Sequence, residues 1–237
     1  SGARVLLVGP DEPTDPSDHQ GTWAGYYDQG RLCHVLEVPL MTSLLAMRSR
    51  RRFDDLIRRT GIDFLTATHS VTVLPEHGVK TSLWFDREVL ARNAADLGVA
   101  VDHLSDDELA AAYPHLGFEP GHVALRERDA FILNPRALVA AELAAALAAG
   151  TDLIRDEVVR TARLPEAVRV HSRGCSTWTS KKVVVATGAA TNAVGLLARP
   201  LHTLTFGATV VLTEVAGPDA VEMPTMMMMK ARGGEVV

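Results

Sequence analysis

Continuous apolar runs and alternating runs divide the chain into predicted strands. Short apolar runs predict strands at residues 4–8, 153–159 and 183–187, where aliphatic and β-branched residues follow one another closely. Runs of this kind, bounded by turn residues, are typical of buried strands in a parallel sheet. We therefore expect these three strands to lie in one mainly parallel sheet, with their ligand-facing ends converging on one edge.

Helical spacing of apolar residues predicts five helices, two of them short. The first covers residues 41–62 and closes at Gly61, and the second begins at an Asp86 cap. A short helix begins with Ser105 and Glu108 in capping-box spacing, and the strongest one begins at Asn134 and Pro135. The last, short helix is predicted at residues 192–198.

Alternating and β-branched segments predict antiparallel strands in the rest of the chain. They lie at residues 64–75, 121–132, 166–174, 176–188 and 203–215, with a hairpin turn at Arg173 and Gly174. The methionines at 226–229 are expected to fill the core from a further strand.

Composition narrows the function classes. The chain has 237 residues and a formal net charge of −5, which argues against a general nucleic-acid-binding role. Cys33 and Cys175 have neither metal-ligand spacing nor a disulfide framework, so we expect a reducing cytoplasm and no metal site. No apolar run approaches the roughly 18–20 residues of a membrane span.

The segment "KKVVVATGAATNAV" at residues 181–194 carries the most chemical information. Its apolar strand is followed by the small residues Ala186, Thr187 and Gly188, which let a ligand approach the backbone. Ligands of open α/β sheets bind at the carboxyl ends of strands, where this triplet is predicted. A tight turn without a ligand is the alternative interpretation of the same residues.

The order of motifs resembles flavoproteins of the D-amino-acid oxidase and sarcosine oxidase family. The helix at 135–149, the strand ending at Val159, the hairpin and the "VVVATG" strand follow one another as in that family. The opening "GARVLLVGPDEP" resembles the family's second strand, and "DHQGTWAGYYDQGR" resembles the loop that lies against the flavin. The resemblance covers nearly the whole chain.

The resemblance implies a flavin site and a reaction class. It implies FAD, held without a covalent bond, and oxidation of a C–N bond in an amino acid or an amine, with the flavin carrying the redox chemistry. The implied cofactor-binding residues are Gly9, Pro10, Asp11, His19, Gln20, Gly21, Thr22, Val159, Ala186, Thr187 and Gly188. Trp23, Tyr26, Tyr27 and Arg31 are the implied substrate-lining residues, and no catalytic residue is assigned.

The implied fold is mixed α/β, with an incomplete Rossmann-like FAD-binding domain interleaved with an antiparallel-sheet substrate domain. Residues 1–70 and 135–200 would form the FAD-binding domain, without its first βα unit, and residues 71–134 and 201–237 would form portions of the substrate domain. The partner would be a small amine or amino-acid substrate.

Three departures from the family pattern support a competing hypothesis. The sequence has no Gly-x-Gly-x-x-Gly loop, Gly9 stands where the family has a ribose-binding acid, and Trp23 stands where the sarcosine oxidases have an arginine. We therefore expect an enzyme truncated at both ends, and Asp11 or Glu12 could substitute for the missing acid. The alternative is a non-catalytic fragment or remnant that does not bind flavin tightly.

Overall fold

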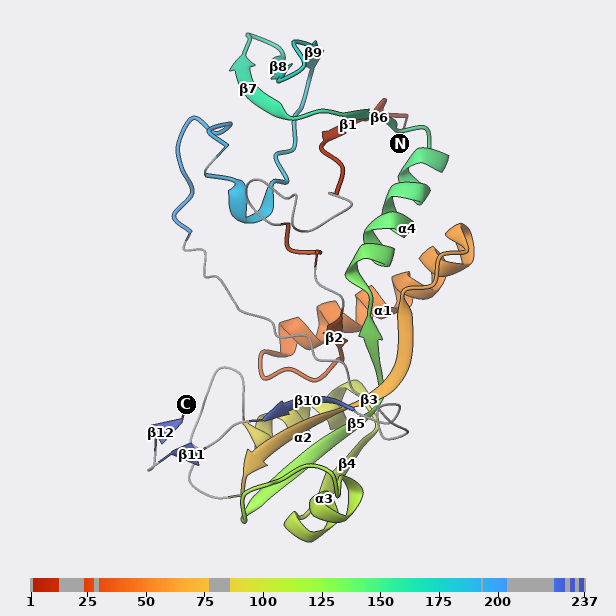
Figure 1. Ribbon diagram of the computed structural model, residues 1–237, viewed down its shortest axis with the longest axis vertical. Helices are drawn as coiled ribbons and strands as arrows, with labels where there is room; N and C mark the ends of the chain where they lie inside the picture. Colours follow the sequence, from red (N-terminus) through yellow and green to blue (C-terminus); the bar gives the residue numbers. More distant parts are fainter. Residues whose placement is uncertain are drawn as a thin grey trace. The chain divides into compact units, whose positions relative to one another are not determined.

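The computed structural model describes residues 2–12, 24–27, 30–76, 86–192, 194–203, 224–228, 231–232 and 235–236. The chain forms two compact units (Figure 1). The first unit contains Ser1–Gln29 and Glu142–Thr213, and the second contains Gly30–Ala141 and Glu214–Val237. Each unit is therefore built from two separate stretches of the sequence. No helix within the described ranges combines the length and apolar character that a membrane crossing requires.

The first unit holds a parallel pair of strands, as the sequence predicted. β1 (Leu6–Gly9) pairs with β6 (Asp152–Arg155), Leu6 lies opposite Asp152, and Gly9 lies opposite Arg155. The N–H of Asp152 also donates to the carbonyl of Val5 at 3.0 Å. The parallel pairing of these two apolar runs is confirmed, and it brings their carboxyl ends to one edge.

The strand predicted at residues 153–159 is in fact two strands in different sheets. β6 ends at Arg155, and β7 (Val158–Arg163) begins an antiparallel sheet with β8 (Val168–Ser172) and β9 (Thr177–Ser180). Asp156 separates them because its carboxylate accepts from the N–H groups of Glu157 and Gly174, which turns the chain. The hairpin predicted between residues 166 and 188 is present as β8 and β9.

The strand predicted at residues 183–187 is wrong. Residues 182–187 have no regular secondary structure, and a 3-10 turn, η2 (Gly188–Ala190), follows them. Among the described residues no strand pairs with this segment, so its backbone lacks the ladder hydrogen bonds that define a strand, and Val184 is 87% exposed. The short helix predicted at 192–198 is also wrong, because its described residues form turns and bends.

The second unit is built on a five-stranded sheet. β5 (His122–Leu133) pairs antiparallel with β3 (Leu65–Pro75), and a bulge lies between Thr68 and Ser70. β4 (Val101–Leu104) and β2 (Arg31–Cys33) pair with β5, and β10 (Thr225–Met228) adds to β3 in parallel. A small hairpin joins β11 (Ala231–Arg232) to β12 (Glu235–Val236). Residues 204–215 of the strand predicted at 203–215 lie outside the described residues.

Four of the five predicted helices are present, and they begin and end close to the predicted residues. They are α1 (Leu40–Thr60), α2 (Arg87–Leu97), α3 (Asp106–Ala112) and α4 (Pro135–Ala148). Gly61 closes α1 in the left-handed region, and the carboxylate of Asp86 caps α2. Asn134 caps α4 by accepting from the N–H of Ala137 at 3.1 Å. These predicted positions are confirmed. The sequence could predict them because each cap acts within one turn of its own helix.

Helices cover both faces of the sheet in the second unit, as Figure 1 shows for α2 and α3. On one face α2 packs its Leu90 and Ala94 against Leu74 and Leu125, together with Leu36. On the other face α3 contributes Leu109, followed by Tyr113, against residues that include Val71, Val73 and Ala124. The two-residue period of the strands sends neighbouring side chains to opposite faces, which explains the two clusters.

The boundaries between the two compact units differ from the predicted domain boundaries. Residues 30–70 lie in the second unit, because β2 and β3 both pair with β5 and residue 70 falls inside β3. On the C-terminal side the division falls within α4, between Ala141 and Glu142. The assignment of FAD to one domain and substrate to the other stays a prediction.

Candidate functional site

The carboxyl ends of β1 and β6 form the best-defined part of the predicted cofactor site. Gly9 ends β1 opposite Arg155, the last residue of β6, and Pro10 and Asp11 continue the chain from there. The carboxylate of Asp11 lies 2.8 Å from the guanidinium of Arg155, and both side chains are substantially exposed. The structure thus brings Gly9 and Asp11 together with Arg155, a residue that the sequence patterns did not single out.

Tyr26 lies within electrostatic reach of the same edge. Burial raises the pKa of Tyr26, the carboxylate of Glu12 raises it further, and the charge of Arg155 opposes both effects. Its ring meets the ring of Tyr27 edge to face, with centroids 4.8 Å apart. Both predicted tyrosines therefore belong to the first unit, close to the residues that follow β1.

The predicted triplet forms an open loop instead of a strand end. Gly188 has a φ of +53°, and the hydroxyl of Thr187 donates to Thr191 at 3.1 Å. The Thr191 hydroxyl in turn donates to the carbonyl of Gly188 at 2.7 Å. A Cβ atom added at Gly9 or Gly188 would meet no described atom within 4 Å, so both backbones are open to a ligand.

The remaining predicted site residues divide between described and undescribed parts of the chain. Val159 lies on β7 beside a bulge and is 42% exposed, and Arg31 begins β2 in the second unit. His19, Gln20, Gly21, Thr22 and Trp23 lie outside the described residues. That Val159 and the triplet share one cleft with Gly9 stays a prediction.

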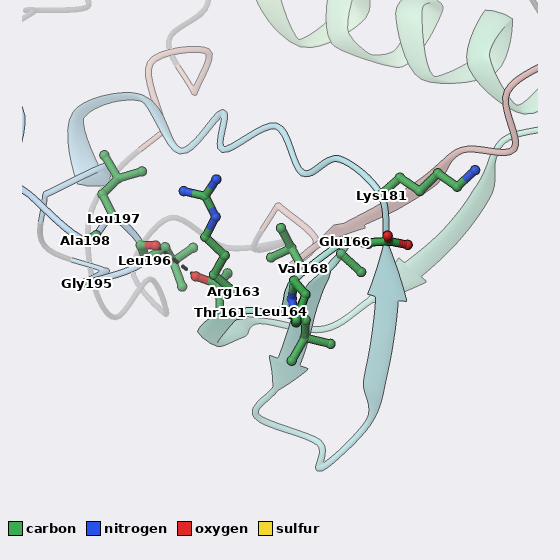
Figure 2. A pocket seen from close by; sticks show the side chains of 12 residues that line it. Thr161, Arg163, Leu164, Glu166, Val168, Lys181, Gly195, Leu196, Leu197 and Ala198 are labelled. Atoms are coloured by element: carbon green, nitrogen blue, oxygen red, sulfur yellow. Dashed lines mark hydrogen bonds between the residues drawn. The ribbon is translucent and has the colours of Figure 1, made fainter.

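A cavity of about 610 Å³ in the first unit was missed from the sequence (Figure 2). It lies between the turn that joins β7 to β8 and residues 195–198, and the Thr161 hydroxyl donates to the Leu196 carbonyl at 2.9 Å. Arg163, Glu166 and Lys181 supply its charged groups. No sequence motif marks these residues, because they come together only through the hairpin and the segment that follows it.

A chain of polar side chains crosses one face of the sheet in the second unit. The Nε2 atom of His69, next to the β3 bulge, lies 2.7 Å from the hydroxyl of Tyr113. Arg126 and Arg128 both donate to the carboxylate of Asp102. Burial lowers the pKa of His69, and the nearby charge of Arg126 lowers it further, so its neutral form is favoured.

The opposite face of the sheet holds a buried carboxylate. Glu127 is 3% exposed and accepts the N–H groups of Val35 at 2.9 Å and Leu36 at 3.0 Å. Burial raises the pKa of Glu127, whereas these N–H groups and the charge of Arg50 oppose the rise. The carboxylate therefore fixes the segment after β2 to the middle of β5.

Solved structures of amine- and amino-acid-oxidising proteins resemble this fold. NikD, described as an unusual amino acid oxidase essential for nikkomycin biosynthesis, has a TM-score of 0.66 at 19% identity, over 81% of this chain and 47% of its own. L-Proline dehydrogenase from P. horikoshii has a TM-score of 0.55 at 17% identity, over 70% and 43%. Iminodiacetate oxidase from Chelativorans sp. BNC1 has a TM-score of 0.53 at 17% identity, over 81% and 51%.

The chain spans about half the length of these solved structures, and at 17–19% identity the likeness shows a shared fold alone. A search of curated proteins finds no match. The family model described as "DAO: FAD dependent oxidoreductase" matches residues 1–236, nearly the whole sequence. The parallel pair of β1 and β6 agrees with the strands that the resemblance to this family predicted. Because the family model matches nearly the whole sequence, the chain belongs to the family of FAD-dependent oxidoreductases.

Proposed function

We propose that the protein takes part in the FAD-dependent oxidation of a C–N bond in an amino acid or an amine. Membership of the FAD-dependent oxidoreductase family supports the cofactor. The solved relatives are named as an amino acid oxidase, an L-proline dehydrogenase and an iminodiacetate oxidase, which supports the substrate class. The structural observation that carries the proposal is the parallel pairing of β1 with β6, because ligands of open α/β sheets bind at the carboxyl ends of parallel strands.

The residues at this edge fit the adenosine part of FAD. Gly9 leaves its backbone open, which is what a closely approaching nucleotide requires, and Gly188, whose backbone is equally open, would join it in the same site. Asp11 bonds Arg155 with one carboxylate oxygen, and a carboxylate offers about four acceptor sites, so it can also accept from a ribose hydroxyl. Asp11 would thus take the role of the family acid that Gly9 replaces.

The other predicted cofactor residues complete the proposal. Pro10 would direct the chain away from the strand end, and Val159, Ala186 and Thr187 would line the pocket without a charge. Residues 19–22 would lie along the flavin, and Trp23, Tyr26, Tyr27 and Arg31 would line the substrate side. FAD would be held without a covalent bond.

FAD and the protein would have different roles in this reaction. When bound, FAD supplies the two-electron acceptor for the oxidation of the C–N bond. The protein's own part is to bind and orient the substrate and to exclude water, and alignment alone can supply a large share of the rate acceleration. Tyr26 favours its protonated form, so its hydroxyl can donate a hydrogen bond at neutral pH.

A Gly188→Leu variant tests the proposed site. The substitution places a bulky side chain in the open space beside the triplet, so we expect flavin content to fall at least tenfold. The measurement is the visible absorption spectrum of the purified protein, in which bound flavin gives two bands. Unchanged flavin content in the variant would remove the triplet from the site.

Gly98→Leu is the matched control for this experiment. Gly98 caps α2 at a φ of +66°, so leucine suffers comparable backbone strain there, but the residue belongs to the second unit. We expect its flavin content to equal that of the unmodified protein. If the unmodified protein itself shows no flavin bands after incubation with FAD, the non-catalytic alternative is supported instead.

A further inference from the structure

A small cavity lies inside the second unit, on the face of the sheet that α2 covers. Its volume is about 10 Å³, and its lining residues are His34, Leu36, Ser70, Thr72, Leu90, Leu125 and Glu127. Leu36, Leu90 and Leu125 belong to the buried cluster on that face. The other four side chains are polar, so the cavity differs from an ordinary packing defect between apolar residues.

His34 lines this cavity and holds a buried ring nitrogen. Its side chain is 8% exposed, and its Nε2 atom lies 3.1 Å from Oε1 of Glu37. The other ring nitrogen, Nδ1, is buried and has no hydrogen-bond partner in the part of the chain that the structure describes. A buried polar atom that makes no hydrogen bond destabilises a fold, so native structures usually satisfy such atoms with protein or water.

The strands supply the other polar groups by their register. Ser70 lies opposite Glu127, Thr72 lies two residues further along β3, and all three are at most 9% exposed. Oε2 of Glu127 accepts from both Val35 and Leu36, whereas Oε1 accepts only from Val35 among the described backbone groups. A carboxylate oxygen offers two acceptor sites, so Oε1 can take one further donor.

We propose that this cavity binds one water molecule, which bridges Nδ1 of His34 to the carboxylate of Glu127 and to the hydroxyl of Thr72. A volume on the order of 10–15 Å³ holds a single water, and polar cavities with two to four partners hold one whereas apolar cavities stay dry. The bridge fixes the segment after β2 to β3 and β5. It acts together with the direct bonds from Val35 and Leu36 to Glu127.

The donor set favours water over a metal ion. Hard cations such as Ca²⁺ and Mg²⁺ take six or more ligands, nearly all of them oxygen. The cavity offers one imidazole nitrogen and the side-chain oxygens of only Ser70, Thr72 and Glu127. A water molecule needs fewer partners and can both donate to the carboxylate and serve the imidazole.

A crystal structure of the protein at a resolution that shows ordered water tests the site directly. The expected result is a single peak in the cavity, about 2.7–3.2 Å from Nδ1 of His34 and from a second polar atom. A cavity without density overturns the proposal. A peak with five or more oxygen ligands at about 2.4 Å also overturns it, because that geometry belongs to a cation.

A Thr72→Val variant tests the same site in solution, with Thr68→Val as its control. Both substitutions replace a hydroxyl by a methyl group on β3, but Thr68 does not line the cavity. If a water is held there, Thr72→Val removes a partner of that water and lowers Tm by about 3 °C or more relative to Thr68→Val. An equal or higher Tm for Thr72→Val indicates a dry cavity and overturns the proposal.

Discussion

At the scale of single residues, Asp102 has the most strongly shifted ionisation in the described chain. Its carboxylate accepts from Nε and Nη2 of Arg126 at 2.9 and 2.7 Å and from Nε of Arg128 at 2.9 Å. Hydrogen bonds from Arg128 and then Arg126 lower the pKa of Asp102 from 3.8 to about 2. The Asp102 side chain is 17% exposed, so solvent screens the interaction only in part.

We expect Asp102→Asn to lower the free energy of unfolding at neutral pH by about 1–2 kcal/mol, after allowance for the exposed Arg128. The sign follows from the lowered pKa: the ionised form is stabilised in the folded state, so its contribution is complete above about pH 4 and is lost as the pH falls through about 2. Urea unfolding at neutral pH and near pH 2 measures both values.

Asp54→Asn provides the control, because Asp54 is exposed on α1 and its substitution removes the same negative charge. Its effect should stay within about 0.5 kcal/mol at either pH. An Asp102→Asn deficit that is equally large near pH 2 would contradict the electrostatic explanation, since Asp102 would then be protonated in about half of the folded molecules and in nearly all of the unfolded ones.

At the scale of elements, local sequence signals explain the helices well. Asp86 accepts the N–H of Val89 at 3.0 Å, and Ser105 and Glu108 satisfy each other's backbone N–H groups in a capping box. Each signal depends on residues within one turn, so its meaning does not change with the rest of the fold. The predicted helix at 192–198 has no comparable cap, and it does not form.

An Asp86→Ala variant measures how much the N-terminal cap of α2 contributes to the stability of the fold. We expect a loss of about 1 kcal/mol in the free energy of unfolding, because the N–H group of Val89 loses its acceptor and the start of α2 loses a favourable negative charge. Asp96→Ala, near the other end of the same helix, should be neutral or slightly stabilising. Thermal or urea unfolding followed by circular dichroism gives both values, and equal losses would contradict the capping role.

Strands depend on partners that the local sequence does not name. The apolar residues 183–185 resemble β1 in composition, yet β1 has a described partner in β6 and residues 183–185 have none. β3 shows the opposite case, because its full length from Leu65 to Pro75 is paired with β5. An apolar run by itself therefore predicts neither pairing nor burial: β1 is paired although Leu6 and Leu7 are 38% and 45% exposed, and Val184 has no described strand partner and is 87% exposed.

At the scale of the whole molecule, the first unit exposes a notable share of apolar side chains. Val184 is 87% exposed, Val5 is 49% exposed and Leu7 is 45% exposed. Exposed apolar residues next to an unpaired strand edge promote association between molecules. The second unit, by contrast, buries two apolar clusters against its sheet.

We expect Val184→Thr to reduce self-association of the chain without changing its helix content. The substitution keeps the β-branched shape and removes apolar surface at the most exposed of the large hydrophobic residues. Dynamic light scattering over a range of protein concentrations is the measurement. Val139→Thr, on α4 and 38% exposed, is the control with similar helix propensity, and an equal effect there would count against a specific role for Val184.

The sequence by itself determined the features that depend on near neighbours along the chain. These are the caps of α1, α2 and α4, the β8–β9 hairpin, and the motif order that placed the chain in the FAD-dependent oxidoreductase family. It also anticipated that the run before Gly9 and the run before Arg155 would lie in one parallel sheet. The caps and the hairpin can be predicted because each of them depends on residues that lie close to one another along the chain.

Only the tertiary structure decided which distant residues meet. Arg155 beside Asp11, the Glu127 carboxylate on the N–H groups of Val35 and Leu36, and the polar cavity around His34 all join segments far apart in the sequence. No periodic pattern in the sequence marks these side chains. A polar residue gives the same sequence pattern whether its side chain bonds a distant residue or faces solvent. Register and packing select the partner, and those are properties of the folded chain as a whole.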